Sequence, residues 1–445
     1  MKLLSTITFL FVFSSVIQAQ TIQVLDEETK KPIAGVAVFN DSKLTTGITD
    51  IDGNIDITNF SENEGITFQH ISHINRFLTK KEIISSGNTI ILSPAASSLD
   101  EVVLSISKFE QNKKEISQKI SSITSKDVLF TNPQTSADLL ERSGNVFIQK
   151  SQLGGGSPII RGFSTNRLLI AVDGTRFNNA IFRGGNVQSV ISIDPFSIER
   201  SEVILGPGSV VYGSDAIGGV MNFYTKNAKF SFKDGASVSG NFTTRYATAS
   251  SEKTGHVDLN LGLNEWAFLT SISYTDFGDL VMGKYGPDDY LRPEYVATIN
   301  GEDVLVINKD PRKQVSSGYK QINAMQKIRF MPSENWDFNL GFFYTTTSDY
   351  PRYDRLIRKK EGQLRSAVWD YTPQEWINGN LRITHKGSSL YDKSIFTLSY
   401  QNFKEGRRDR DFGDTILYET KEKVNAYTSA LDFIKKFGKS KLFYG

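Results

Sequence analysis

The amino-acid sequence predicts a mainly β protein with three parts: an N-terminal β-sandwich, an α+β domain, and the first part of a transmembrane antiparallel β-barrel. Three observations predict this fold class. From about residue 235 onward, segments of roughly ten residues alternate apolar and polar side chains, as the strands of a membrane barrel do. Long and short connections follow one another between these segments. The N-terminal residues have the composition of an export signal.

The composition narrows the possible classes. The chain has 51 Lys and Arg against 49 Asp and Glu, so its net charge gives no support for a nucleic-acid partner. It has no cysteine, which excludes a disulfide framework. No segment after the N-terminus is apolar enough for a spanning helix. Two classes remain possible, a soluble exported protein and a membrane β-barrel. A barrel is not excluded, because its alternating strands do not raise the average hydropathy.

Residues 1–20 are predicted to be a signal peptide. Lys2 precedes an apolar stretch over residues 3–17, and Ala19 is a small residue that suits cleavage near position 19 or 20. A short membrane anchor is the alternative, although the apolar stretch is short for a membrane span. With the barrel pattern, export leads us to expect a location in the outer membrane.

Residues 21–95 are predicted to form the β-sandwich. Short alternating strands such as 21–26 and 88–93 are separated by the turn sequences KKPIAG and TDIDGN. The stretches KPIAGVAVF, TTGITDIDGNIDI and ITFQHISHI resemble the carboxypeptidase-regulatory-like domain. Residues 96–115 follow as a polar linker that contains a short β-prone run, LDEVVLS, at 99–105.

Residues 116–228 are predicted to form a compact α+β domain. A helix is expected over 136–149, and strands are expected over 167–174 and 200–206. The domain ends in a glycine-rich stretch at 206–226, GPGSVVYGSDAIGGVMNFYTK.

The glycine-rich stretch matches no nucleotide-binding motif. Val211 stands where a dinucleotide loop needs glycine, and Gly219 and Val220 stand where a P-loop needs Lys and Ser or Thr. We therefore expect its glycines to let backbone segments turn and pack closely. Residues 220–226 are expected to be the last strand of the domain.

Residues 229–445 are predicted to form the partial barrel. In one segment Trp336, Phe338, Leu340, Phe342 and Tyr344 share one face, opposite Asp337, Asn339 and Gly341. Long connections are expected at 247–255, 277–318, 349–373 and 406–421, with short ones between them. Long loops at one end of the strands are typical of an outer-membrane barrel, whereas a soluble β-sandwich, the alternative, has no reason to place them so. We expect about nine strands where a plugged barrel has roughly 22, and hence a fragment of a longer protein.

No enzyme active site is predicted. Ser209 and Ser214 lack the flanking glycines of a nucleophile elbow. The four histidines are His70, His73, His256 and His385. The first two lie three residues apart beside a strand, a spacing expected to point them to opposite faces, and the last two are expected on strands with structural, lumen-facing roles. We therefore expect no catalytic residue, no cofactor and no metal site.

Four motifs resemble the plug domain of TonB-dependent outer-membrane receptors and follow in that family's order. They are IRGF at 160–163, NRLLIAVDG at 166–174, IERSEV at 198–203 and the glycine-rich stretch. The motif residues are Arg161, Gly162, Asn166, Arg167, Asp173, Gly174, Glu202, Gly206, Pro207, Gly208, Tyr212, Gly213, Gly218 and Gly219. With the sandwich, the linker and the barrel strands, the resemblance covers the whole chain.

The resemblance implies an importer whose plug blocks the lumen of a barrel embedded in outer-membrane lipids. Ligand binds from outside, and TonB with its inner-membrane motor proteins pulls on a short extended segment, the TonB box, to rearrange the plug. The candidate box is Leu99, Asp100, Glu101, Val102, Val103 and Leu104. Such a peptide can add to the edge of a partner's sheet through main-chain hydrogen bonds. The alternative is that this run is the last strand of the sandwich.

The resemblance also implies roles for two charged residues. Arg161 resembles the plug arginine that pairs with acidic residues in the lumen, and Glu202 resembles a plug carboxylate in a similar contact. Ordinary surface salt bridges are the alternative for both. Leu205 stands where many family members have arginine, so one pair between plug and barrel is expected to be absent or relocated.

The ligand is inferred from a narrower resemblance. Residues 180–195, 206–223 and 352–376 resemble the haem and haemoprotein receptors of Bacteroidetes-like bacteria, which implies haem, a haemoprotein or a ferric siderophore as ligand. The candidate ligand contacts are Arg176, Phe182, Arg183, Tyr285, Tyr290, Tyr350 and Tyr353. The expected loops hold tyrosines but no histidine, although both are haem ligands.

Three alternatives remain open from the sequence. A glycan or peptide importer of the same architecture would pair with a surface lipoprotein. A soluble exported enzyme could carry a regulatory sandwich, although no catalytic constellation is present. An adhesin or structural barrel would need neither a plug nor a TonB box.

Overall fold

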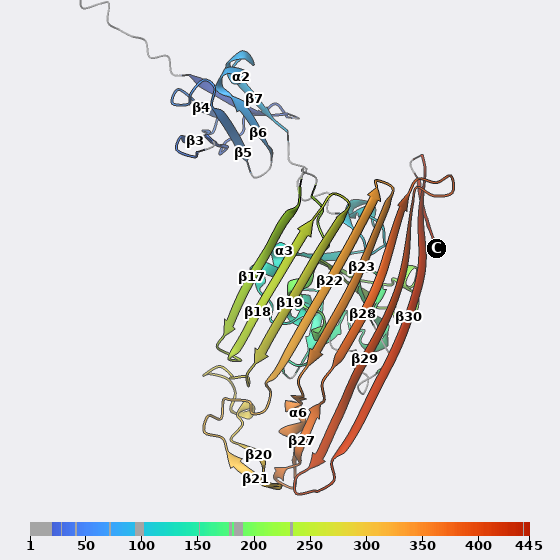
Figure 1. Cartoon of the computed structure of the whole chain (residues 1–445). Helices are drawn as coiled ribbons and strands as arrows, with labels where there is room; N and C mark the ends of the chain where they lie inside the picture. Colours follow the sequence, from blue (N-terminus) through green and yellow to red (C-terminus); the bar gives the residue numbers. More distant parts are fainter. Residues whose placement is uncertain are drawn as a thin grey trace, which may run out of the picture. The chain divides into compact units, whose positions relative to one another are not determined.

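The chain divides into two compact units, which are described separately. The computed structural model describes residues 20–445 except 28, 41, 71–72, 94–101, 151, 178–179, 182–189, 232–234 and 439. The first unit is Met1–Glu101 with Asn112–Lys114, and the second is Val102–Gln111 with Glu115–Gly445. Figure 1 shows both units with their strands labelled. The predicted signal peptide lies outside the described residues, apart from Gln20.

The first unit is a β-sandwich, as predicted. Its elements are β1 (Thr21–Asp26), β2 (Ala37–Asn40), β3 (Thr46–Ile48), β4 (Asn54–Asp56), β5 (Gly65–His70), β6 (His73–Thr79), α2 (Lys80–Ser85) and β7 (Thr89–Leu92). One sheet has the order β4-β1-β7 and the other β3-β2-β5-β6. Alternate residues point into a common core, where Val24, Val38, Ile66 and Phe68 have no exposed surface.

The two histidines of the sandwich contact each other, so the prediction that they point to opposite faces was wrong. The β5–β6 hairpin pairs His70 directly with His73 after a register shift at Phe68, and their Nδ1 atoms lie 3.0 Å apart. His73 Nε2 lies 2.9 Å from an Asp26 carboxylate oxygen. Within the described residues, no group of three or more His, Cys, Asp or Glu side chains could hold a metal ion.

Acidification should destabilise the sandwich. Burial, and then the neighbouring His73, lower the pKa of His70, so the unfolded chain binds a proton more readily than the folded domain does. The free energy of unfolding should therefore fall as the pH drops through 6.5 towards the lowered folded value. Thermal unfolding of residues 20–93 between pH 8 and pH 5 measures this fall. A His70→Gln domain with an equally steep pH dependence would show that His70 is not the cause.

The second unit begins with an α+β domain, here called the inner domain (residues 115–228). The short elements β8 (Val102–Val103), β9 (Gln111–Asn112) and η2 (Lys113–Glu115) precede it. Its own elements are β10 (Ile120–Thr124), α3 (Ser125–Thr131), α4 (Ser136–Glu141), β11 (Phe147–Gln149), β12 (Ser157–Ile159), η3 (Thr165–Arg167), β13 (Leu168–Val172), β14 (Thr175–Arg176), η4 (Val190–Ser192), η5 (Pro195–Ser197), β15 (Ile198–Ile204), α5 (Ser209–Tyr212) and β16 (Gly219–Thr225). Five strands form one sheet in the order β10-β15-β16-β13-β14. Within this described sheet, β13 and β16 are the only parallel neighbours.

The helix predicted over 136–149 is much shorter in the structure. A capping box between Thr135 and Asp138 starts α4. The helix ends at Glu141, and Gly144 then adopts a positive φ of 68°, which a helix cannot continue through. Residues 147–149 form β11, paired with β12.

The glycine-rich stretch packs closely against its neighbours, as predicted. A Cβ atom on Gly219 would lie 2.8 Å from the carbonyl oxygen of Ile204. A Cβ atom on Gly218 would lie 2.4 Å from side-chain atoms of Phe163. Both positions therefore require glycine for close approach. The strand that follows, β16, has β15 and β13 on either side and is the predicted last strand.

A large antiparallel sheet follows the inner domain, and Figure 1 shows its long strands side by side. In the described residues, nine strands pair in chain order: β17 (Ser237–Ala247), β18 (Glu252–Gly262), β19 (Trp266–Phe277), β22 (Tyr319–Ser333), β23 (Trp336–Thr347), β28 (Glu375–Lys386), β29 (Lys393–Asp411), β30 (Tyr418–Phe437) and β31 (Ser440–Tyr444). Connections carry β20 (Glu294–Ile299), β21 (Glu302–Ile307), η6 (Asp288–Tyr290), β24 (Tyr350–Pro351), α6 (Tyr353–Leu356), β25 (Lys359–Lys360), β26 (Gln363–Leu364) and β27 (Ser366–Tyr371). The predicted fold class is confirmed.

Two of the predicted long connections are short. The first is only residues 248–251, and the charged stretch 406–421 is mostly strand, because β29 reaches Asp411 and β30 begins at Tyr418. Opposite charges across the β29–β30 pair, such as Arg407 with Glu422 at 3.0 Å, favour the extended strands. The predicted long connections after β19 and β23 are observed.

The faces of the large sheet have reversed polarity. On β18 the inward residues His256, Asp258 and Asn260 are 3, 5 and 7% exposed. Their outward neighbours Val257 and Leu259 are 46 and 52% exposed. The alternation predicted from the sequence is therefore present, with the polar face covered and the apolar face open. No helix in the described ranges is long and apolar enough to cross a membrane.

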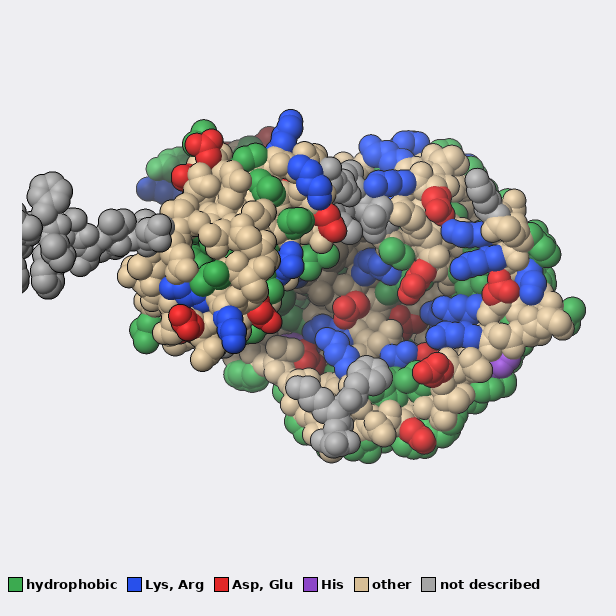
Figure 2. All heavy atoms as spheres, turned by 90° about the horizontal axis from the view of Figure 1, so that it is seen from above, with side chains coloured by type: hydrophobic (Ala, Val, Ile, Leu, Met, Phe, Trp, Pro, Cys, Tyr) green, Lys and Arg blue, Asp and Glu red, His purple; other side chains and the backbone are tan. Residues whose placement is uncertain are grey.

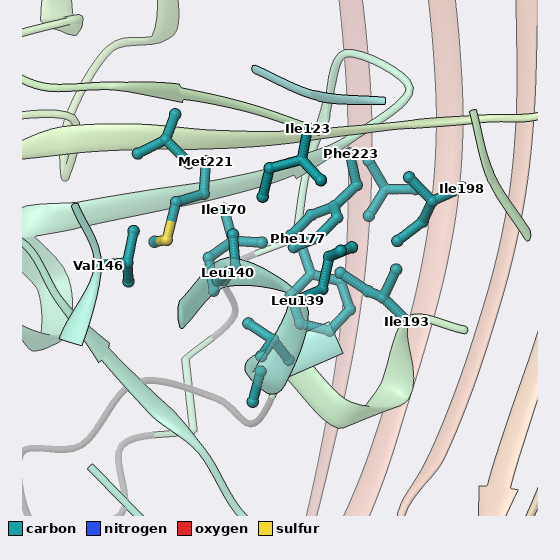
Figure 3. Packing of buried hydrophobic residues seen from close by; sticks show 14 of the residues in the cluster. Ile123, Leu139, Leu140, Val146, Ile170, Phe177, Ile193, Ile198, Met221 and Phe223 are labelled. Atoms are coloured by element: carbon teal, nitrogen blue, oxygen red, sulfur yellow. The ribbon is translucent and has the colours of Figure 1, made fainter. Parts of the chain in front are cut away.

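The inner domain packs against the inward face of this sheet. Its core, shown in Figure 3, includes Leu139 and Leu140 of α4 and extends to sheet residues. Phe177 lies edge-on against Trp376 of β28 and Phe403 of β29, with ring centroids 5.1 and 5.4 Å apart. One continuous apolar cluster thus joins the inner domain to the sheet.

Candidate functional site

The segment before the inner domain is held by a buried carboxylate. Glu202, on β15, has no exposed surface, and its carboxylate accepts hydrogen bonds from the backbone N–H groups of Leu104 at 3.0 Å and Ser105 at 2.8 Å. Arg200 pairs with Glu202 at 2.9 Å and donates to the carbonyl oxygen of Val102 at 2.8 Å. We call Arg200 and Glu202 the segment clamp.

The clamp binds the part of the predicted TonB box that the structure describes, residues 102–104. Val102, Val103 and Leu104 belong to the second unit, so the alternative that they are the last strand of the sandwich is wrong. Val103 is completely buried. The other predicted members, Leu99, Asp100 and Glu101, lie outside the described residues.

The clamp also corrects the expected roles of two motif residues. The described polar partners of Glu202 are the segment and Arg200, not the large sheet. Arg161 donates to the carbonyl oxygen of Leu205 at 3.3 Å, within the inner domain. Neither residue makes the predicted tether to the sheet in the described part of the chain.

Other ion pairs join the inner domain to the sheet. Asp173 lies 3.0 Å from Lys327 on β22, and its carboxylate also accepts from the N–H of Thr225. Lys226 lies 2.9 Å from Asp258 on β18. Asp173 was among the motif residues, but its partner was missed. The sequence feature that could have identified this partner is Lys327, a lysine at an inward position of a strand with alternating polarity.

A third link runs through a histidine. Ser273 of β19 donates to Asp194 of the inner domain at 2.6 Å, and its oxygen lies 2.7 Å from His256 Nδ1. His256 Nε2 lies 3.2 Å from Asp258, and Phe196 stacks on the ring. These contacts include a Ser-His-Asp set, but the serine is occupied by Asp194 and the imidazole is covered. The arrangement joins the inner domain to the sheet.

The histidine on β18 therefore faces inward, as predicted, but the one on β28 does not. His385 pairs with Trp336, which is 41% exposed on the outward face, and their rings are 4.2 Å apart. Its Nδ1 lies 3.0 Å from the hydroxyl of Tyr391. The prediction of a lumen-facing role was wrong for His385, because its position on β28 has outward parity.

The four tyrosines among the predicted ligand contacts differ in exposure. Tyr285 and Tyr290 are 92 and 63% exposed in the connection after β19. Tyr350 and Tyr353 are buried, and Tyr350 packs in an aromatic cluster that fills the space beside Gly154. These buried rings stabilise the connection and do not present a surface to a ligand.

Of the remaining predicted contacts, the structure describes only Arg176. Arg176 is bound to Asp215 and donates to the hydroxyl of Ser214 at 3.2 Å, within the inner domain. Phe182 and Arg183 lie outside the described residues. The other motif residues, Gly162, Asn166, Arg167, Gly174, Gly206, Pro207, Gly208, Tyr212, Gly213, Gly218 and Gly219, lie in turns, short helices and strand ends of the inner domain.

The sequence analysis also did not predict an ion pair between a connection and the large sheet. Arg410, near the end of β29, makes two hydrogen bonds of 2.6 and 2.7 Å to Asp303 on β21. The hydrogen bonds from Arg410 lower the pKa of Asp303 to about 2. The pair fixes the β20–β21 hairpin to the end of the large sheet.

Known proteins share these features over parts of their length. Residues 112–220 match the model of the TonB-dependent Receptor Plug Domain. The chain is 26% identical over 333 residues to a vitamin B12 transporter BtuB of Photobacterium profundum, covering 74% of this chain and 46% of that protein. It is 39% identical over 136 residues to a vitamin B12 transporter BtuB of Vibrio vulnificus, covering 30% of this chain and 22% of that protein.

Solved structures share the fold. The copper transporter OprC matches 73% of this chain and 44% of its own with a TM-score of 0.56 and 14% identity. A ferric enterobactin receptor (PfeA) matches 72% of this chain and 47% of its own with a TM-score of 0.52 and 14% identity. At such identities the likeness concerns the fold alone. The chain spans less than half the length of these relatives.

Removing the clamp's charge should loosen the segment. Glu202→Gln keeps the shape but replaces two charge-assisted hydrogen bonds, which contribute about 1.5–3 kcal/mol each when the acceptor is charged. The chain has no cysteine, so a Ser105→Cys reporter can be labelled selectively. Its maleimide labelling rate should rise at least about tenfold with Glu202→Gln. The exposed Glu199→Gln on the same strand should leave the rate unchanged. Equal rates in both backgrounds would contradict the clamp.

These matches agree with the geometry of the inner domain and the sheet. Residues 112–220 match the plug domain of TonB-dependent receptors, and the chain is homologous to a vitamin B12 transporter over 74% of its length.

Proposed function

We propose that this chain is the plug and the first part of the barrel of an outer-membrane importer energised by TonB and its inner-membrane motor proteins. The observation that carries this proposal is a plug domain seated on the polar face of a sheet whose other face is apolar and exposed. A soluble protein would bury the apolar face instead.

The outward face suits contact with lipid. Phe242, Leu259, Leu340 and Phe342 are 77, 52, 47 and 51% exposed on long neighbouring strands. Outward apolar side chains that alternate with inward polar ones are typical of outer-membrane strands. Exposed apolar area of this kind marks a membrane or partner surface. The surrounding lipids would cover it.

An arginine on this face should destabilise the protein in a bilayer. Leu340→Arg near the middle of β23 should cost about 2–4 kcal/mol, because the charge would lie in hydrocarbon. Thr384→Arg is the matched control, since it places the same charge inward opposite Asp337. Unfolding in lipid vesicles by urea titration compares the two variants. Equal losses would argue against a lipid-facing surface.

We propose that residues 99–104 are the TonB box. The described part, Val102–Leu104, is extended and bound to the plug by its main chain. A partner that offers a sheet edge would satisfy the same backbone groups. The clamp would therefore compete with TonB for this segment.

Deleting residues 100–104 should abolish energised import. The measurement is growth of cells that depend on this receptor for haem, a ferric siderophore or vitamin B12, with receptor abundance checked in outer membranes. Loss of growth with normal abundance is expected. Growth at the normal rate would exclude energy coupling through this segment.

We propose a metal-containing ligand, either haem or a ferric siderophore. The exposed tyrosines of the connection after β19 are oxygen donors that suit ferric iron. The vitamin B12 transporters among the relatives favour a corrinoid as the second candidate. Binding of the full-length protein to haem, haemoproteins, ferric siderophores and vitamin B12 would distinguish them.

Several finer assignments remain part of the proposal. Residues 1–20 would be the signal peptide, and residues 21–95 a carboxypeptidase-regulatory-like domain of the Bacteroidetes-type receptors. A surface lipoprotein would be a partner if the ligand were a glycan or a peptide. We assign no enzymatic activity to the chain.

A further inference from the structure

The segment beyond the clamp has a second attachment, this time to the sheet. Lys108 Nζ lies 2.9 and 3.0 Å from the two carboxylate oxygens of Asp432 on β30. The next residue, Phe109, is 3% exposed and packs against Ile395 of β29 and Ile434 of β30. We call Lys108 and Phe109 the wall anchor. Figure 2 shows acidic and basic side chains gathered in a hollow of the surface.

The backbone at the wall anchor indicates that these side chains are required there. Lys108 has a φ of +64°, in the left-handed region that favours glycine. A lysine in this conformation is strained, so its contact with Asp432 compensates for the strain. Ser107 Oγ accepts from the N–H of Phe109 at 3.4 Å, which closes the turn.

The two attachments are close together in the chain. The clamp holds Val102–Ser105 on the plug, and the wall anchor begins only three residues later. The plug strand β10 starts at Ile120, beyond the wall anchor. A pull on Val102 must therefore first open the clamp and the β8–β9 pair, and it then meets the wall anchor before it can load β10.

We propose that the wall anchor limits the length of chain that a pull on the box can withdraw, once the clamp has opened, before plug strand β10 is loaded. This inference rests on the proposed function for its biological meaning, but its mechanics do not depend on TonB. Residues 102–107 reach about 20 Å when extended, and this is the slack that the wall anchor permits. Its ion pair is 18 and 19% exposed, so water can replace the contact when the load exceeds it.

Single-molecule force spectroscopy on the full-length protein in a lipid bilayer tests this proposal. Val102→Cys supplies a unique attachment point, because the chain has no other cysteine. The native sequence should give a first rupture at the clamp, an extension of about 20 Å, and then a second rupture. The double variant Asp432→Asn with Phe109→Ala should lose the second rupture and keep the first, which shows that the plug is folded.

Two controls separate the wall anchor from general damage. Exchanging the charges, Lys108→Asp with Asp432→Lys, should retain the second rupture. Asp392→Asn removes a carboxylate that pairs with Lys435 on the neighbouring strands and should change neither rupture. A second rupture that persists in the double variant, or that disappears in the charge exchange, would overturn the proposal. Because the handle replaces TonB, these outcomes are independent of the deletion experiment on residues 100–104.

Discussion

The polar inward face of the large sheet needs hydrogen-bonding and ionic partners, and the plug supplies them. Lys327 is 3% exposed, and an unpaired charge so deeply buried would be costly. Asp173 pairs with it, and Lys226 pairs with Asp258. The reversed polarity of the sheet therefore determines both what lies inside it and what can surround it.

This dependence also fits the proposed function, in which the plug would be held firmly and still move. Charged and hydrogen-bonded contacts in a wet lumen can be exchanged for water, whereas an apolar core resists separation. The plug combines both, with Phe177 packed on the sheet and ion pairs around it. In the proposed function, a pull by TonB would act first on the segment clamp on β15.

The period-two alternation made the barrel strands predictable, because it depends only on neighbouring residues. The motif order of the plug predicted its sheet and the close packing at Gly218 and Gly219. Local signals also failed, since the helix predicted over 136–149 ends at Glu141, ahead of Gly144 with its positive φ. Charged residues that indicated a loop instead pair across β29 and β30.

The site was less predictable than the fold. Glu202 was identified as a functional residue, but its partners are backbone amides of Leu104 and Ser105, which any side chain would provide. The pair of Asp173 with Lys327 joins residues distant in sequence, so its geometry depends on how the plug is seated. Tyr350 illustrates the same limit, because burial rather than residue type decides its role.

The central claim is that TonB draws residues 102–105 from the clamp while the plug stays seated in the sheet. Hydrogen exchange at single amides, with and without the periplasmic domain of TonB, measures this directly. Exchange at Ser105, which follows the box, should accelerate when TonB is added, and the Thr225 amide, which donates to Asp173, should remain protected. Unchanged exchange at Ser105, with TonB bound, would contradict the account.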